Sequence, residues 1–311
     1  MSTALAADVR EGGRWSLAQR AKNDLIFAGA FVALHGTRFV PPRWLRGAGR
    51  ALGHVLHRLL GSERRRADAN VARALPSLRP AERAELVSRS FVALGGVLGE
   101  TLAALWSPPP SLPFAEADRA ILSDALAEGR GVVLPSAHLG PWERVASTLV
   151  AAGFPLVALV RESYDARFDR WMARLRARGG VGTIPRGRPG AAASILRTLR
   201  AGKVLGAPMD LRSRVPSVDV PFFGVPAPTA VGPARIAIRA RAPVVVATVE
   251  RQPDGALALT CTRLEAIDDA TALTARINEE LTRRIATAPE LWPWMHPRFA
   301  KLLRDPRQSP D

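Results

Sequence analysis

The chain has 311 residues, of which 47% are hydrophobic and 23% are charged. This length and composition are typical of one large or two smaller folded domains, and they exclude general disorder. The 44 Lys and Arg residues outnumber the 28 Asp and Glu residues, which gives a formal net charge of +16. Such an excess indicates an acidic partner, which is nucleic acid, an anionic membrane surface or an acidic carrier protein.

The single cysteine, Cys261, excludes an intrachain disulfide and a cysteine-rich metal site. The five histidines show no ligand spacing, so neither a metal nor a cofactor is expected.

The first third of the chain predicts helices near a membrane. Residues 1–22 are polar and small, as in a loose terminus. The apolar run at residues 25–34 is too short for a confident membrane span, which needs roughly 20 residues. Residues 43–66 place leucines and valines at helical spacing among arginines, close to Trp44. This pattern predicts an amphipathic helix in the headgroup region, and the alternative is a helix packed on the globular part with solvated arginines. Residues 23–106 are therefore expected to form a helical, membrane-associating region.

A stiff proline segment at residues 107–111 marks the best internal boundary. Beyond it, residues 107–305 are expected to form an α/β domain, because probable helices alternate with short apolar strands. The helices are expected at residues 115–128, 144–152, 164–178, 191–200, 229–240 and 269–288, and the strands at 132–135, 155–160, 204–207, 244–249 and 257–264. Strands separated by helices predict a mainly parallel central sheet flanked by helices.

Three polar residues stand just after predicted strands: His138, Arg161 and Asp210. In parallel sheets the chemistry gathers beyond the carboxyl ends of the strands, so these side chains are expected to share one edge. Glu143 follows His138 by five positions, in the opening turn of a predicted helix. A neutral imidazole takes a proton from an alcohol only if a partner holds its tautomer and offsets the charge it gains, and the Glu143 carboxylate is expected to do both. The alternative is that both residues only cap and solvate the start of a helix.

Several blocks carry a family resemblance. His138 and Glu143 form a His-x4-Glu motif, Arg161 follows the second strand, and Asp210 follows Pro208 and Met209. Residues 220–229 read Val-Pro-Phe-Phe-Gly-Val-Pro-Ala-Pro-Thr, and residues 292–299 read Trp-Pro-Trp-Met-His-Pro-Arg-Phe. From about residue 25 to 301 the chain resembles the lysophospholipid acyltransferase superfamily, and within it the bacterial lipid A biosynthesis (lauroyl/myristoyl) acyltransferases. It departs from their pattern at Met209 and Pro297.

The resemblance implies a glycerol-3-phosphate acyltransferase-like fold and transfer of a fatty acyl group to a lipid or glycolipid hydroxyl, with a lipid A-type acceptor favoured. The donor would be a thioester of acyl carrier protein, which is acidic, or of coenzyme A. His138 would be the general base, without a covalent acyl-enzyme, and amides near Gly140 would hold the thioester oxyanion. The implied location is the cytoplasmic face of the bacterial inner membrane. Another glycolipid or a lysophospholipid is the alternative acceptor.

The remaining candidates are substrate-binding residues. Guanidinium groups match phosphate oxygens, so the acceptor phosphates are assigned to Arg161, Arg174, Arg176 and Arg186. A solvated helix face is the alternative for Arg174 and Arg176, and Asp210 is expected to aim one of the arginines. Phe223 and Thr229 belong to a loop that lies near the acyl chain or, equally, is a packing plug. Trp292 and Trp294 are expected at the membrane interface or in the core.

Two other classes of protein stay open. A basic, arginine-rich α/β protein can bind nucleic acid or a membrane without catalysis. Against nucleic acid, the chain has one tyrosine, lacks the interleaved aromatic and basic motifs of RNA-binding sheets, and shows no recognisable helix-turn-helix. A degenerate acyltransferase that acts as a scaffold is the third class, and the presence of both His138 and Glu143 argues against it.

Overall fold

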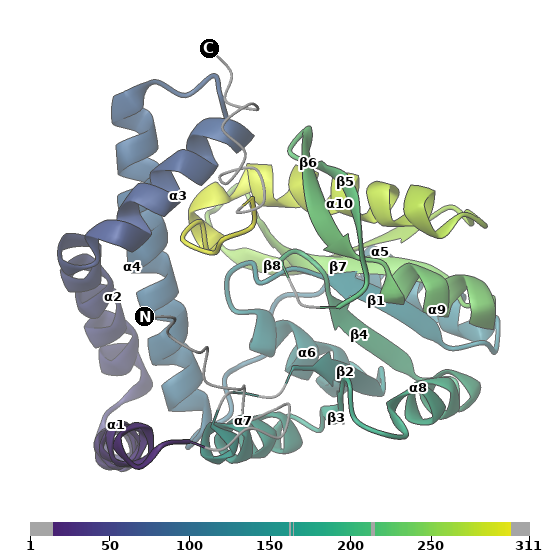
Figure 1. The fold of residues 1–311 in the computed structure, drawn as a ribbon. Helices are drawn as coiled ribbons and strands as arrows, with labels where there is room; N and C mark the ends of the chain where they lie inside the picture. The colour runs from purple at the N-terminus through teal and green to yellow at the C-terminus, as the bar shows by residue number, and fades with distance from the viewer. Residues whose placement is uncertain (1–14, 162, 164, 213–214, 300–311) are drawn as a thin grey trace.

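The computed structural model describes residues 15–161, 163, 165–212 and 215–299. Its first part is helical, with α1 (Leu17–Gly36), the short η2 (Thr37–Phe39), α2 (Pro42–Leu59), α3 (Gly61–Ala74) and α4 (Pro80–Ala104). These helices stand as a wall beside the rest of the chain (Figure 1). Helix α1 begins at Leu17, so part of the stretch expected to be a loose terminus is helical, and residues 1–14 lie outside the described residues.

The second part is an α/β unit built on a six-stranded sheet with the order β3-β2-β4-β1-β7-β8. All neighbouring pairs in the sheet are parallel except β7 and β8. The predicted mainly parallel sheet flanked by helices is confirmed (Figure 1). Its strands are β1 (Val132–Ser136), β2 (Leu156–Val160), β3 (Gly182–Pro185), β4 (Val204–Pro208), β7 (Val244–Arg251) and β8 (Leu257–Leu264). The helices are α5 (Glu116–Ala127), α6 (Trp142–Ala151), α7 (Ala166–Arg178), α8 (Ala191–Arg200), α9 (Gly232–Ala240), α10 (Ala270–Thr287) and the short η3 (Pro289–Leu291).

The sequence did not predict an antiparallel hairpin, β5 (Ser217–Phe222) and β6 (Val225–Ala230). The expected helix at residues 229–240 begins only at Gly232, because Thr229 and Ala230 belong to β6. Prolines at positions 221, 226 and 228 hide the strand pattern, since proline is depleted in strands. The turn residues Phe223 and Gly224 both have positive φ, 53° and 73°, as a two-residue type I′ turn requires. Such a φ is costly for phenylalanine, so contacts around the ring must hold it.

Helices α2 and α4 pack at backbone distance. A Cβ atom built on Gly49 would lie 2.1 Å from the Gly95 carbonyl oxygen, and one on Gly53 would lie 2.4 Å from the Phe91 oxygen. Gly99 meets the carbonyl oxygen of Leu45 in the same way, at 2.2 Å. Only glycine fits such contacts. Among the described helices, α4 alone is long and apolar enough to span a membrane, but half of its apolar window is buried in the protein, as in the core helix of a soluble protein.

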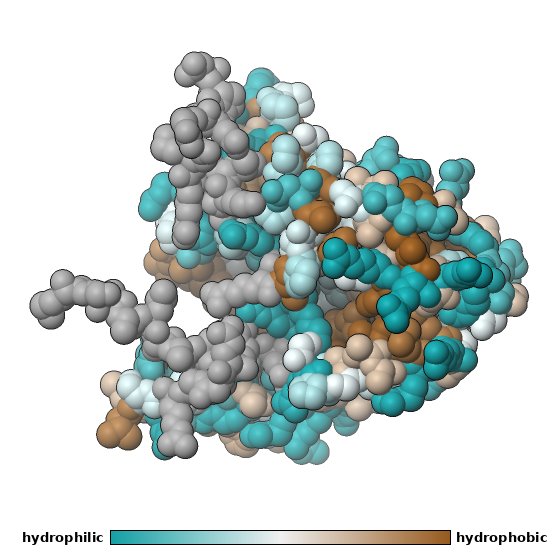
Figure 2. All heavy atoms as spheres, turned by 45° about the vertical axis from the view of Figure 1, so that its right-hand side comes forward, coloured by the Kyte–Doolittle hydropathy of each residue, from teal (hydrophilic) through white to brown (hydrophobic). Residues whose placement is uncertain are grey.

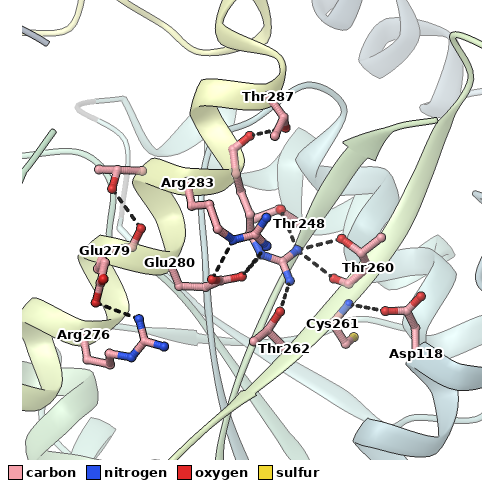
Figure 3. Close-up of polar contacts among 12 residues, drawn as sticks. Asp118, Thr248, Thr260, Cys261, Thr262, Arg276, Glu279, Glu280, Arg283 and Thr287 are labelled. Carbon is pink, nitrogen blue, oxygen red and sulfur yellow. Dashed lines mark hydrogen bonds and ion pairs between the residues drawn. The ribbon is translucent and has the colours of Figure 1, made fainter. Parts of the chain in front are cut away.

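Helix α10 is fixed to the sheet by a buried guanidinium. The side chain of Arg284 is 1% exposed. It donates to the Oγ1 atoms of Thr248, Thr260 and Thr262 at 3.1, 2.7 and 2.7 Å, and to Glu280 Oε1 at 2.7 Å. Figure 3 shows the three threonines of β7 and β8 facing Glu280 of α10. Burial raises the pKa of Glu280, but hydrogen bonds from Arg283 and Arg284 outweigh it and lower that pKa to about 2. The pair is therefore ionised, and it ties α10 to β7 and β8.

Candidate active site

Strands β1 and β4 bring His138 and Asp210 together. The two strands are adjacent and parallel, with Ser136 level with Pro208. Each functional residue stands two positions beyond its strand, so both reach the same point at the carboxyl edge of the sheet. The Nδ1 atom of His138 lies 2.8 Å from Asp210 Oδ1, and the His138 backbone N–H donates to Oδ2 at 2.9 Å. The expectation that these side chains share one edge is confirmed.

Asp210 is fully buried and is held by a second donor, because Trp292 Nε1 donates to its Oδ2 at 2.8 Å. Burial favours the neutral acid, but the charge of His138 and the hydrogen bonds from His138 and Trp292 outweigh burial, so the pKa of Asp210 is lowered. For His138, burial lowers the pKa of the ring, but the charge and hydrogen bond of Asp210 outweigh it and raise that pKa overall. The ionised Asp210 thus accepts a hydrogen bond from Nδ1–H of His138. This leaves Nε2 as the unprotonated, basic nitrogen of the neutral ring.

The structure corrects two roles predicted from the sequence. Glu143 was expected to orient His138, but it forms a two-point ion pair with Arg176, at 2.6 and 3.0 Å. Asp210 was expected to aim an arginine, but it holds His138 instead. The reason is topological: the end of β4 lies beside the end of β1, whereas Glu143 sits in the first turn of α6 and faces α7. Glu143 still raises the pKa of His138 through its charge, after the effects of burial and Asp210.

A pocket of about 300 Å³, here called the reaction pocket, opens next to His138. Its floor is apolar and lies between the sheet and α6, with Leu134, Val145, Leu149, Leu156, Ala158 and Gly206 among the lining residues. Its remaining lining mixes apolar and polar residues, and the polar ones include Arg161, Arg176, Arg186 and Arg212. The pocket therefore combines an apolar space, a base and several guanidinium groups.

The arginines predicted to bind phosphate divide into two groups. Arg161, Arg176 and Arg186 line the reaction pocket, whereas Arg174 is exposed on α7 and lines a separate pocket beside α1. Burial lowers the pKa of Arg186 first, and the nearby charge of Arg161 lowers it further. Two guanidinium groups that repel each other in a pocket favour an anion between them.

Three other candidates are not placed to contact substrate. The Gly140 N–H donates to the Leu291 carbonyl at 3.0 Å, so this amide is not available for an oxyanion. Thr229 is fully buried, and its hydroxyl accepts from Asn278 and Arg298 at 2.9 and 2.7 Å. Phe223 is half-buried against Phe222 and Trp294, and its ring centroid lies 5.4 and 5.7 Å from theirs. Of the two expectations for this loop, these contacts favour packing.

Trp292 and Trp294 are fully buried, which rules out the membrane interface for both.

The reaction pocket also holds residues that sequence reasoning missed. His296 lines it, and burial lowers the pKa of this ring to about 4, so the imidazole stays neutral and can donate a hydrogen bond to a substrate. Asn70 of α3 holds the segment in place by donating to the carbonyls of Trp294 and His296 at 2.7 and 2.8 Å. The ring of Trp142 packs edge-on against His138, with centroids 5.2 Å apart. His296 lies in the block at residues 292–299 that resembles the family.

The fold and the pocket together define a class of protein. A buried carboxylate holds a histidine at the carboxyl edge of a parallel sheet, beside an apolar pocket lined with arginines, which is an arrangement suited to general-base chemistry on an anionic, partly apolar substrate. The family model of bacterial lipid A biosynthesis acyltransferases matches residues 17–301, and the chain belongs to this family. No curated protein matches the chain significantly.

Proposed function

We propose that this protein transfers a fatty acyl group from a thioester to a hydroxyl of a lipid or glycolipid, with a lipid A-type acceptor favoured. The observation that carries the proposal is the Asp210-held imidazole of His138 at the mouth of an apolar pocket. Nδ1 donates to Asp210, so Nε2 takes the proton of the acceptor hydroxyl. The hydroxyl oxygen attacks the thioester carbonyl, a C–O bond forms, the C–S bond breaks, and the departing thiolate takes the proton from His138.

The pocket supports the two kinds of substrate that this reaction joins. Its apolar floor fits an acyl chain, and Arg161 and Arg186 fit a phosphate of the acceptor. The donor side is supported by a groove of about 690 Å³ between α2, α4 and the α/β unit. Five arginines and two glutamates line it, namely Arg46, Arg50, Arg89, Arg144, Arg251, Glu100 and Glu290. This positive excess suits an acidic carrier protein or the phosphates of coenzyme A.

Mass spectrometry of lipids tests the function. Cells that lack the protein are expected to accumulate one lipid class that is short of one acyl chain, and the purified protein is expected to restore the chain from a radiolabelled acyl thioester. The missing chain identifies the acceptor and the chain length together. An unchanged lipid profile, combined with no transfer in the purified system, would contradict the proposal.

We propose that the protein attaches to the cytoplasmic face of the inner membrane, and the helical wall supports attachment to a membrane surface. On α1 and α2 several large apolar side chains are more than 60% exposed, namely Leu17, Leu25, Val32, Trp44 and Leu59. The amphipathic α2 buries Leu45, Gly49 and Gly53 against the protein, so its other face is free to lie on lipid. On the face of the α/β unit seen in Figure 2, hydrophilic residues alternate with hydrophobic areas.

Glutamate at Trp44 and Leu59 together is expected to weaken binding to phosphatidylglycerol vesicles by about tenfold or more, because apolar burial at the interface is lost and two negative charges are added. Vesicle sedimentation measures the effect. The matched control is Ala193→Glu, an exposed position on α8, which lies on the opposite side of the molecule from the helical wall (Figure 1). Equal binding by all variants would show that α2 packs on the protein without a membrane role.

A further inference from the structure

A second pocket of about 390 Å³ lies on the far side of the Glu143–Arg176 ion pair. This outer pocket is enclosed by α4, α6, α7 and the proline segment at residues 108–111. Its lining is mainly apolar and includes Val97, Ala104, Pro108, Pro109, Val150, Ala151, Leu175 and Val181, with Arg144 and Arg178 as additional cations.

The outer pocket and the reaction pocket share one wall. Glu143 and Arg176 line both of them, and their side chains are 17% and 20% exposed. Two hydrogen bonds join the two side chains, so they form this wall together. The ion pair of Glu143 and Arg176 therefore stands between the outer pocket and the pocket of His138.

Acyl transfer to a lipid brings together two substrates that each carry an apolar chain, and both must be bound at once. The floor of the reaction pocket offers one apolar space. We propose that the outer pocket binds an acyl chain of the acceptor lipid, while the reaction pocket takes the chain of the donor. The inference rests on the proposed function, and it gives Glu143 and Arg176 the role of a partition that keeps the two chains apart.

The surroundings of the outer pocket favour a membrane lipid as its occupant. Another pocket, of about 480 Å³ and lined by Leu34, Leu105, Trp106 and Trp171, lies between α1, the end of α4 and α7, and it shares Arg178 with the outer pocket. Helix α1 packs there, with the ring of Phe27 stacked on Trp171 at 5.0 Å. The pocket beside α1 and the outer pocket therefore adjoin at Arg178. Arg178 supplies a charge that suits a lipid phosphate.

Photolabelling tests the site without relying on turnover. The probe is a diazirine derivative of palmitic acid, added to the detergent-solubilised full chain, and labelled peptides are identified by mass spectrometry. Ala151 is exposed and lines the outer pocket, so Ala151→Trp fills it without disturbing the core. Labelling of residues 97–104 and 175–181 is expected to fall about tenfold, equivalent to about 1.4 kcal/mol of binding. The matched control, Ala286→Trp on α10, is expected to leave it unchanged.

Competition with lauroyl-coenzyme A separates the two pockets. The thioester is expected to suppress labelling of residues 156–161 in the reaction pocket and to spare residues 178–181, which line the outer pocket but neither the reaction pocket nor the donor groove. In the transfer assay, Ala151→Trp is expected to raise KM for the acceptor and to leave KM for the donor unchanged. Labels confined to the reaction pocket, or labels at 97–104 that Ala151→Trp does not reduce, would overturn the inference while acyl transfer itself persists. Absent transfer with intact labelling at 97–104 would instead contradict the proposed function.

Discussion

His138→Ala is expected to reduce kcat for acyl transfer by about 10²–10⁴-fold, the range that a positioned general base contributes. The loss has a direct cause, because alanine provides no atom to take the proton of the acceptor hydroxyl. Transfer from a radiolabelled thioester measures it. Vesicle binding serves as a control and is expected to match that of the parent protein. The thermal midpoint is expected to fall while the protein stays folded, because the fully buried Asp210 loses the His138 ring but keeps the donors of the His138 backbone and of Trp292. Full turnover by a folded His138→Ala protein would contradict the mechanism.

Asp210→Asn is expected to lower kcat nearly as much as His138→Ala. Comparing it with Glu143→Gln shows which of the two carboxylates holds His138. The amide has almost the shape of the acid but no charge, so the tautomer that makes Nε2 basic is no longer favoured, and a loss of kcat of about 10²–10⁴-fold follows. Glu143→Gln is expected to cost at most about tenfold, because Glu143 acts on the base only through its charge. Equal losses for the two variants would show that Glu143 holds the base as the sequence alone suggested.

The pH profile gives an independent measure of the same pair. Asp210 raises the pKa of His138, and only the neutral ring is a base, so the acidic limb of kcat/KM lies above the ordinary histidine value of about 6.5. In Asp210→Asn this contribution disappears while burial still lowers the pKa of His138. The acidic limb of the residual activity is therefore expected to move to lower pH.

The second large effect concerns stability. Arg284→Ala is expected to lower the free energy of unfolding by about 3–5 kcal/mol, because it leaves Glu280 buried and removes the donors to three threonines. The matched control is Arg283→Ala, which removes the other partner of Glu280. The side chain of Arg283 is 53% exposed, so its loss is expected to cost less than about 1 kcal/mol. Urea denaturation measures both values, and equal small losses would contradict a structural role for the buried guanidinium.

The ion pair of Glu280 and Arg284 also makes the free energy of unfolding depend on pH. The folded-state pKa of Glu280 is about 2, below the unfolded value of about 4.3. Its ionised form therefore stabilises the fold above about pH 4.3, and this stabilisation is lost as the pH falls towards 2. In Arg284→Ala the pKa of Glu280 moves back up, so less of the unfolding free energy is expected to depend on pH in that window.

Much of the site was visible in the sequence because it follows from the local pattern. Apolar runs separated by helical segments predicted a parallel sheet, and residues just after parallel strands must share one edge. This placed His138, Arg161 and Asp210 together. The hairpin β5–β6 was missed because its prolines obscure the strand pattern and its turn puts Phe223 at positive φ, a conformation stabilised only by its neighbours.

The sequence by itself determined the fold class, the family blocks and the histidine that we propose as the base. Only the tertiary structure decided which carboxylate holds that base. A spacing of five residues made Glu143 the obvious partner, but the strand order puts β4 beside β1, and so Asp210, 72 positions away, meets Nδ1. Glu143 points towards α7, where it forms an ion pair with Arg176. The partners of a side chain depend on which strands and helices are neighbours in the folded protein. The spacing of residues along the chain does not determine the order of the strands in the sheet.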